Sequence, residues 1–254
     1  MTSYKHFFFL TGLLLFATEL WAFEASPQDT IWKKYRNGTT TFEIYNGEVD
    51  LPPRWRNQFS INFGFNRWAG TMPDDYGLRF FPSNHFSVAF SKARQIGGSE
   101  SPWSIQAGLE TAWYYLRFQN NAYIRKGEQG ITFESNGFGL SRNQLTCLQI
   151  QLPISLRYEF LDSEYRQKMH LTIGFYAGYI AHRFARARFE DAEGNTRDIY
   201  TYNDFYLNPW QWGLQAEWGY GYLHLFAKYQ ISPLFQAGRA PEAQVLTLGL
   251  GLHL

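Results

Sequence analysis

Residues 245–254 read VLTLGLGLHL and alternate between two kinds of side chain. Leucine occupies positions 246, 248, 250, 252 and 254, and the positions between them carry threonine, glycine or histidine. Successive side chains of a β-strand point to opposite faces, so this pattern predicts a strand with one wholly apolar face. The side chains on the other face are small and include no cluster of charged residues. A strand of a soluble sandwich, by contrast, exposes charged residues to water. We therefore expect this strand to have lipid on its leucine side.

The same two-residue period recurs upstream. Seven further segments alternate apolar residues with polar residues or glycine, at 58–68, 85–93, 103–118, 147–160, 170–187, 209–219 and 222–231. Their connections alternate in length, with the long ones at 69–84, 119–146, 188–208 and 232–244, as in outer-membrane barrels. The sequence thus predicts an all-β fold, an eight-stranded antiparallel up-and-down transmembrane β-barrel with long extracellular loops and short periplasmic turns. A soluble lipocalin-like barrel, with its apolar residues inward, is the alternative.

Aromatic residues on the outward faces are expected at two levels. The outer level comprises Trp113, Tyr115, Tyr179, Trp210, Trp212 and Tyr229. The inner level comprises Phe59, Trp103, Tyr158, Phe160 and Trp218. Aromatic girdles at both headgroup regions are typical of barrels that span a membrane.

The composition excludes several other classes of protein. The 254 residues include 23 Phe, 17 Tyr and 9 Trp, whereas 18% are charged. Lysine plus arginine (23) nearly balances aspartate plus glutamate (22), so nucleic acid is not an expected partner. The single cysteine, Cys147, excludes an intramolecular disulfide and a cysteine-cluster metal site. No metal-ligand spacing, phosphate loop or dinucleotide motif occurs, so neither a metal nor a cofactor is expected.

The N-terminus has the layout of a secretory signal peptide. Lys5 and His6 precede an apolar run at 7–16, and Ala22 offers a cleavage site. The run is shorter than the roughly 20 apolar residues of a transmembrane helix. The expected organisation is therefore a signal peptide at 1–22, a periplasmic N-terminal lead-in at 23–57 and the outer-membrane β-barrel at 58–254.

Motifs in the C-terminal half and on the fourth predicted strand carry a family resemblance. They are Phe205-Tyr206-Leu207-Asn208-Pro209, Gly219-Tyr220-Gly221, Phe226-Ala227-Lys228-Tyr229, Ser232-Pro233-Leu234-Phe235, Pro241-Glu242 and Leu152-Pro153-Ile154. On these residues the chain resembles the porin-like outer-membrane β-barrel domain family that is abundant in Bacteroidota. The resemblance implies a small barrel in the bacterial outer membrane, in a family whose members mostly have no assigned activity. The terminal Leu254 departs from the aromatic residue that ends many outer-membrane barrels.

Ionisable side chains on the inward faces are candidates for a network in the lumen. They are Glu110, Arg157, Glu159, Glu217, His224 and Lys228. An eight-stranded barrel encloses a space that side chains can fill, and unpaired charges there are costly, so we expect these groups to compensate one another. A two-residue turn at Tyr220-Gly221 would place Glu217 directly opposite His224, within hydrogen-bond reach. Glu110 and Lys228 fall at similar heights. A proton relay or a ligand site is the alternative to a purely structural network.

Four arginines cluster near the outer end of the fifth predicted strand and its loop. They are Arg183, Arg186, Arg188 and Arg197, of which alternation places Arg183 on the lipid side. Guanidinium groups can bind lipid phosphates in a bidentate manner, and they can also simply extend to water at the rim. Both interpretations stay open. Outer-membrane lipids and lipopolysaccharide are the expected partners, with envelope proteins as further partners.

A lipid-modifying hydrolase would need histidine, serine and a carboxylate near the outer lip. His182 has no nucleophile beside it, whereas His85 and Ser87 have suitable spacing on the second predicted strand. One such pair does not identify a catalytic site, so no catalytic residue is assigned. We expect a non-enzymatic barrel with a structural or interaction role in the cell envelope. The alternatives are a hydrolase of lipid A or phospholipid, and a small-ligand binder or narrow channel.

Overall fold

The computed structural model describes residues 33–36, 39–42, 55–70, 77–79, 81, 83–97, 101–120, 122–135, 140–160, 169–190 and 194–254. The chain divides into two compact units, residues 1–49 and 50–254. Within the first unit, β1 (Lys33–Arg36) pairs antiparallel with β2 (Thr39–Phe42). The predicted signal peptide at 1–22 and most of the predicted lead-in lie outside the described residues. The described part contains no helix long and apolar enough to cross a membrane.

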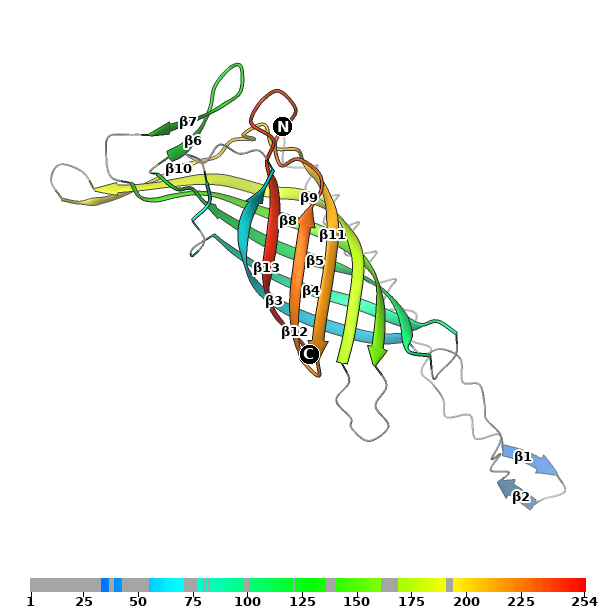
Figure 1. The fold of residues 1–254 in the computed structure, drawn as a ribbon. Coiled ribbons are helices and arrows are strands. Elements are labelled where there is room, and N and C mark those ends of the chain that lie inside the picture. Colours follow the sequence, from blue (N-terminus) through cyan, green and yellow to red (C-terminus); the bar gives the residue numbers. More distant parts are fainter. Residues whose placement is uncertain are drawn as a thin grey trace. The chain divides into compact units, whose positions relative to one another are not determined.

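Eight strands of the second unit form a closed antiparallel ring (Figure 1). They are β3 (Trp55–Ala69), β4 (Asn84–Gln95), β5 (Trp103–Arg117), β8 (Leu140–Phe160), β9 (Met169–Glu190), β11 (Trp210–Tyr220), β12 (Leu223–Gln230) and β13 (Gln244–His253). Strands adjacent in this order pair with one another, and β13 returns to pair with β3. The predicted up-and-down barrel, with its alternating connection lengths, is confirmed.

Side-chain alternation places the apolar face outside the ring. On β13, Leu250 is 52% exposed and its outward neighbours Leu248 and Leu252 are similar, whereas Thr247 and His253 are buried inside. Aromatic residues also meet where adjacent strands run side by side on this outer surface: Tyr179 packs edge-on against Trp210 at 5.2 Å between ring centroids. The leucine face is therefore the lipid face, because the interior is lined by polar groups.

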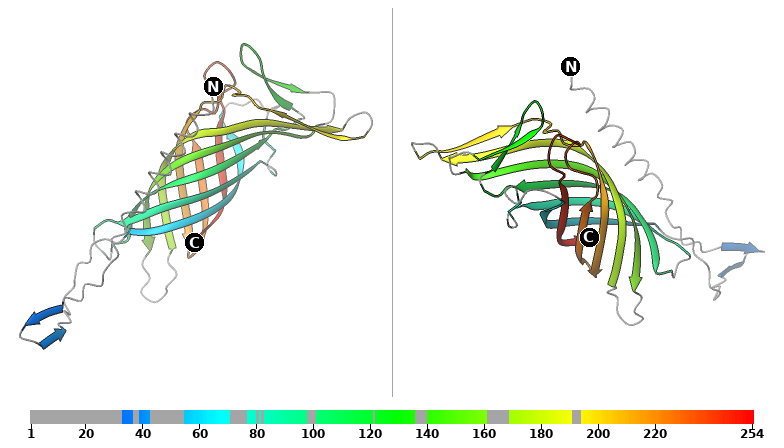
Figure 2. Two further views of the ribbon diagram at one scale, coloured as in Figure 1. Left: turned by 180° about the vertical axis from the view of Figure 1, so that it is seen from behind. Right: turned by 45° about the horizontal axis from the view of Figure 1, so that its top comes forward.

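Strands β8 and β9 continue past the barrel into a small extracellular sheet (Figure 2). This extracellular sheet consists of the outer ends of β8 and β9 and of β10 (Thr196–Thr201), which pairs with β9. β6 (Ala122–Lys126) and β7 (Ile131–Ser135) pair with each other in a separate two-stranded sheet. The sequence placed these segments in loops, since β10 is exposed on both faces and has no apolar face, and β6 and β7 are only five residues long each. The two predicted loops at 119–146 and 188–208 therefore contain strands.

A β-bulge in β9 changes which way its outer half faces. Gln149 of β8 pairs with Ile180, but the preceding Leu148 pairs with His182, so Ala181 is the extra residue. An extra residue in one strand shifts the inward and outward positions beyond it by one. Arg183 is thereby paired with the inward Cys147 instead of facing lipid.

The outer mouth of the barrel is covered by an apolar cluster built largely from the long loops. Phe205 and Leu207 of the loop before β11 pack with Leu234 and Phe235 of the loop before β13, and all four are almost fully buried. Asn208 ties the two loops together, because its side-chain amide donates to the carbonyls of Pro233 (2.7 Å) and Phe235 (2.9 Å). The described residues thus form an apolar cap above a polar lumen.

Candidate functional site

A buried ion pair crosses the middle of the lumen. The Nζ of Lys228 on β12 donates to both carboxylate oxygens of Glu110 on β5, at 2.5 Å each, and to Oε1 of Gln151 on β8 at 3.1 Å. The lysine and glutamate side chains are only 5% and 3% exposed. The expectation that Glu110 and Lys228 lie at similar heights is confirmed.

Neutral side chains extend this pair across the barrel. The Gln151 amide donates to the hydroxyl of Tyr114 (3.0 Å) and to Oε1 of Gln149 (2.8 Å). The Lys228 ammonium also lies 5.3 Å from the centre of the Tyr176 ring. Strands β5, β8, β9 and β12 therefore contribute to one hydrogen-bonded layer that fills the section of the barrel below the cap.

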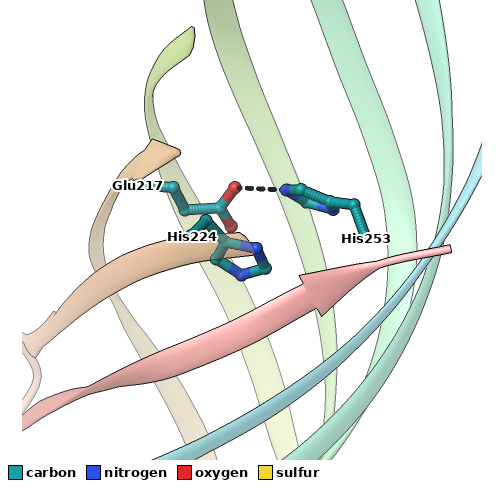
Figure 3. Close-up of side chains that lie close together, drawn as sticks. All are labelled: Glu217, His224 and His253. Carbon is teal, nitrogen blue, oxygen red and sulfur yellow. Dashed lines mark ion pairs between the residues drawn. The ribbon is translucent and has the colours of Figure 1, made fainter. Parts of the chain in front are cut away.

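A second cluster lies nearer the inner end and contains Glu217 on β11, His224 on β12 and His253 on β13 (Figure 3). One possible ligand atom from each residue lies within 4.8 Å of the other two. The shortest carboxylate contact joins Oε2 of Glu217 to Nε2 of His253 at 3.6 Å. Three consecutive strands thus bring two imidazoles and one carboxylate together.

The predicted pairing of Glu217 directly opposite His224 is wrong. The hairpin turn consists of Gly221 and Tyr222, so His224 pairs with Gly219 and Glu217 pairs with Phe226. Gly221 adopts a φ of 58°, which glycine tolerates at a tight turn. Because the shift amounts to two positions on β12, both residues keep their inward orientation. His253, which alternation also places inward, lies next to Glu217 instead, with Nε2 3.6 Å from Oε2.

Two glycines make room for the imidazole rings. A Cβ added at Gly251 would collide with the ring of His224 and with Asn62, and one added at Gly219 would collide with the ring of His170. The His224 and His253 rings stack with centroids 4.0 Å apart. Small residues on β11 and β13 therefore allow the histidines to lie close together.

Arg157 and Glu159 lie at the inner mouth of the lumen. Nε of Arg157 lies 3.4 Å from Oε1 of Glu159, and Arg56 reaches the same carboxylate at 3.8 Å. These residues line a pocket of about 170 Å³ together with Gln58 and Gln106. The six inward ionisable groups predicted from the sequence are thus all inside the barrel, but they form a central pair and an inner group instead of one continuous chain.

The four outer arginines do not gather into one site. Arg186 and Arg188 both chelate the carboxylate of Asp198 on β10, with four hydrogen bonds of 2.9–3.0 Å. These bonds hold the pKa of the Asp198 carboxyl well below its usual range. Arg197 is adjacent to Asp198 on the strand and so points to the opposite face. The prediction that Arg183 faces lipid is wrong, because the bulge at Ala181 turns it to the side of Cys147.

The candidate hydrolytic residues also lie apart. His85 and Ser87 both point into the lumen and are fully buried, and Ser87 accepts a hydrogen bond from the Asn62 amide at 3.2 Å. His182 lies on the outer face beside Phe184 and Tyr202. Among the described residues, neither histidine joins a serine and a carboxylate at the outer lip.

The closed ring, its apolar exterior and its polar interior define an outer-membrane β-barrel. The family model described as the outer membrane protein beta-barrel domain matches residues 52–233, which covers more than half of the chain, and the chain belongs to this family. The match includes the barrel strands from β3 to β12. The sequence-based resemblance to an outer-membrane barrel family is confirmed.

Two solved structures match most of the chain at low sequence identity. Neisserial surface protein A is 10% identical, with a TM-score of 0.34, and the match covers 79% of this chain and 98% of that chain. Ail, the attachment invasion locus protein of Yersinia pestis, solved in complex with the heparin analogue sucrose octasulfate, is 12% identical, with a TM-score of 0.30, over 80% and 100% of the two chains. The sequence matches no curated protein significantly.

Proposed function

We propose that this protein is a non-enzymatic outer-membrane barrel with a structural or interaction role in the cell envelope, and that its extracellular sheet is the interaction surface. The observation that carries the proposal is that side chains occupy the middle and the outer mouth of the lumen. The Glu110–Lys228–Gln151 layer occupies its middle, and the apolar cluster around Phe205 covers its outer mouth. Such an interior favours a barrel that anchors the extracellular sheet in the membrane over a diffusion channel.

The extracellular sheet offers an exposed surface that mixes aromatic rings with charge. On β10 and just beyond it, Tyr200 and Tyr202 are exposed, the latter by 67%. The Arg186 guanidinium lies 5.2 Å from the centre of the Tyr200 ring, and Asp198 neutralises one of the two arginine charges nearby. Tyrosine and arginine are enriched in protein interfaces, so this surface suits an envelope partner. Lipopolysaccharide and outer-membrane lipids are the proposed partners of the apolar belt below it.

The first experiment measures ion conductance of the full mature protein in planar lipid bilayers. We expect no steady current beyond that of the bilayer, with an open porin as the positive control. A stable single-channel current in the wild-type protein would contradict the anchor role and favour the narrow channel.

The second experiment compares proteins and lipids that co-purify from native outer membranes. The test variant carries Tyr200→Ser and Tyr202→Ser on the extracellular sheet, and the matched control carries Tyr222→Ser in the turn at the opposite end of the barrel. We expect the test variant alone to lose a bound species that the wild type retains. Identical bound species in all three samples would refute the proposed interaction surface.

A further inference from the structure

We propose that Glu217, His224 and His253 bind a divalent transition-metal ion, best matched by zinc, at the inner end of the lumen. The three side chains come from consecutive strands, and their ligand atoms lie within 4.8 Å of one another. In a tetrahedral site with bonds of about 2.0–2.1 Å, neighbouring ligand atoms are roughly 3.3 Å apart. The Glu217–His253 contact of 3.6 Å is already close to this separation.

Asn62 on β3 orients His224 as a metal ligand. Its side-chain amide donates to the hydroxyl of Ser87, which turns its Oδ1 toward Nε2 of His224 at 2.8 Å. In a neutral imidazole this contact assigns the proton to Nε2 and leaves a lone pair on Nδ1. Metal-binding histidines commonly have their other ring nitrogen fixed by a carbonyl or carboxylate in this way. Nδ1 of His224 has no hydrogen-bond partner within the described structure.

The neighbouring imidazoles also contain buried nitrogens that the protein leaves without hydrogen bonds. Both ring nitrogens of His253 and both of His170 lack such a partner among the described residues, and both side chains are buried. The two rings lie 5.3 Å apart between centroids. Buried polar atoms are rarely left unsatisfied, so a concentration of them around one carboxylate indicates that something else completes the group. A cation bonded to the Glu217 carboxylate, to Nδ1 of His224 and to one ring nitrogen of His253 would give two of these nitrogens a partner.

The surrounding charges permit a cation. Glu217 supplies one negative charge, and the nearby Arg157 is balanced by Glu159 at 3.4 Å. Lys228, which also acts on Glu217, is held by Glu110. With the histidines neutral, Arg157, Glu159 and Glu217 together carry a charge of −1, which the more exposed Arg56 offsets at the inner mouth. The carboxylate of Glu217 therefore remains the local negative charge to which a cation would bind.

The ligand types select the class of metal. Two imidazoles and one carboxylate suit zinc and its neighbours in the first transition row, whereas calcium and magnesium prefer oxygen ligands. The side chains of Glu217 and His253 are 16% and 11% exposed, so the site is not sealed from the inner mouth. Three protein ligands leave a fourth position for water or another small ligand.

The test uses the full mature protein, folded in detergent without a polyhistidine tag and stripped with a chelator. Cobalt(II) serves as a spectroscopic probe through its visible absorption bands, and zinc binding is measured by calorimetry. We expect one cobalt per chain, displaced by zinc. Glu217→Gln and His253→Gln should each weaken zinc binding at least tenfold, and Asn62→Ala should weaken it by about 10–100-fold, as loss of a supporting hydrogen bond does.

His182→Gln is the matched control, because His182 lies on the outer surface away from the cluster. This variant should bind zinc as the wild type does. Folding of every variant is checked by its heat-dependent mobility on gels, and Asn62→Ala tests the site if a ligand variant fails to fold. Absence of saturable binding in the wild type, or equal affinity in folded Glu217, His253 and Asn62 variants, would overturn the proposal.

Discussion

Removing one member of the Glu110–Lys228 pair should destabilise the barrel much more than removing both. The Glu110→Gln variant leaves a buried ammonium without its counter-ion, and the Lys228→Met variant leaves a buried carboxylate. The double variant replaces both charges with neutral side chains of similar size. The two groups lie within 2.5 Å of each other and are almost completely buried, so solvent cannot compensate for the missing partner.

The magnitude follows from the cost of an uncompensated buried charge. Breaking such a pair on one side costs about 3–5 kcal/mol, whereas replacing both partners is often close to neutral. Gln151 adds to the cost of Lys228→Met, since its Oε1 loses the 3.1 Å hydrogen bond from the ammonium. The single variants should thus sum to roughly 6–10 kcal/mol, and the double variant should fall at least about 3 kcal/mol below that sum.

The assay is reversible urea unfolding in lipid vesicles, followed by tryptophan fluorescence. Leu225→Ala, an outward residue on the same strand as Lys228, controls for general effects of substitution in β12. Single variants within about 1 kcal/mol of the wild type, or a double variant equal to the sum of the singles, would refute the view that this pair is a coupled unit buried in the lumen.

Three further predictions concern the extracellular sheet, the cap and the lipid face. Arg186 and its neighbour lower the pKa of Asp198, so the stabilisation from this carboxylate is present above about pH 4 and is lost as the pH falls below that value. Asp198→Asn should therefore reduce the hydrogen-exchange protection of β10 at pH 7, and its difference from the wild type should shrink below about pH 4; a constant difference would contradict the assignment. Phe205→Ala should open a cavity in the cap and cost about 3–5 kcal/mol, measured by unfolding and by faster proteolysis of the outer loops; unchanged protease resistance would argue against the cap. Leu250→Arg should lower the free energy of unfolding in vesicles by about 2–4 kcal/mol because position 250 faces the hydrocarbon, whereas Leu254→Arg at the strand end should lower it by about 0–1 kcal/mol. Equal losses would show that the lipid boundary does not lie between these two positions.

The inward and outward faces could be predicted because they depend on a local property of the chain. Any extended segment alternates its side chains, so the leucines at 246–254 must share a face wherever the strand lies. The alternation of long and short connections then indicated an antiparallel ring, because neighbouring strands in such a barrel follow one another in sequence. This reasoning identified the inward Glu110 and Lys228 without any knowledge of their distance.

Which inward residues contact one another depends on strand register, and the alternation of side chains does not specify register. The hairpin turn at Gly221-Tyr222 lies one residue later than expected, which moves Glu217 from His224 to Phe226 in the register and brings His253 into contact with it. A two-position change in pairing preserves every face, so the residue pattern is equally compatible with both registers. Only the paired strands distinguish them.

The sequence by itself determined the number of barrel strands, the lipid face and the set of polar groups inside, because these follow from the period of a single strand and the need to keep charge out of hydrocarbon. Tertiary structure alone decided which of those groups meet. The bulge at Ala181 turned Arg183 inward, the loops around Phe205 closed the outer mouth, and β11, β12 and β13 assembled the Glu217, His224 and His253 cluster. Each of these depends on contacts between different strands and loops, which the residue pattern of a single strand does not specify.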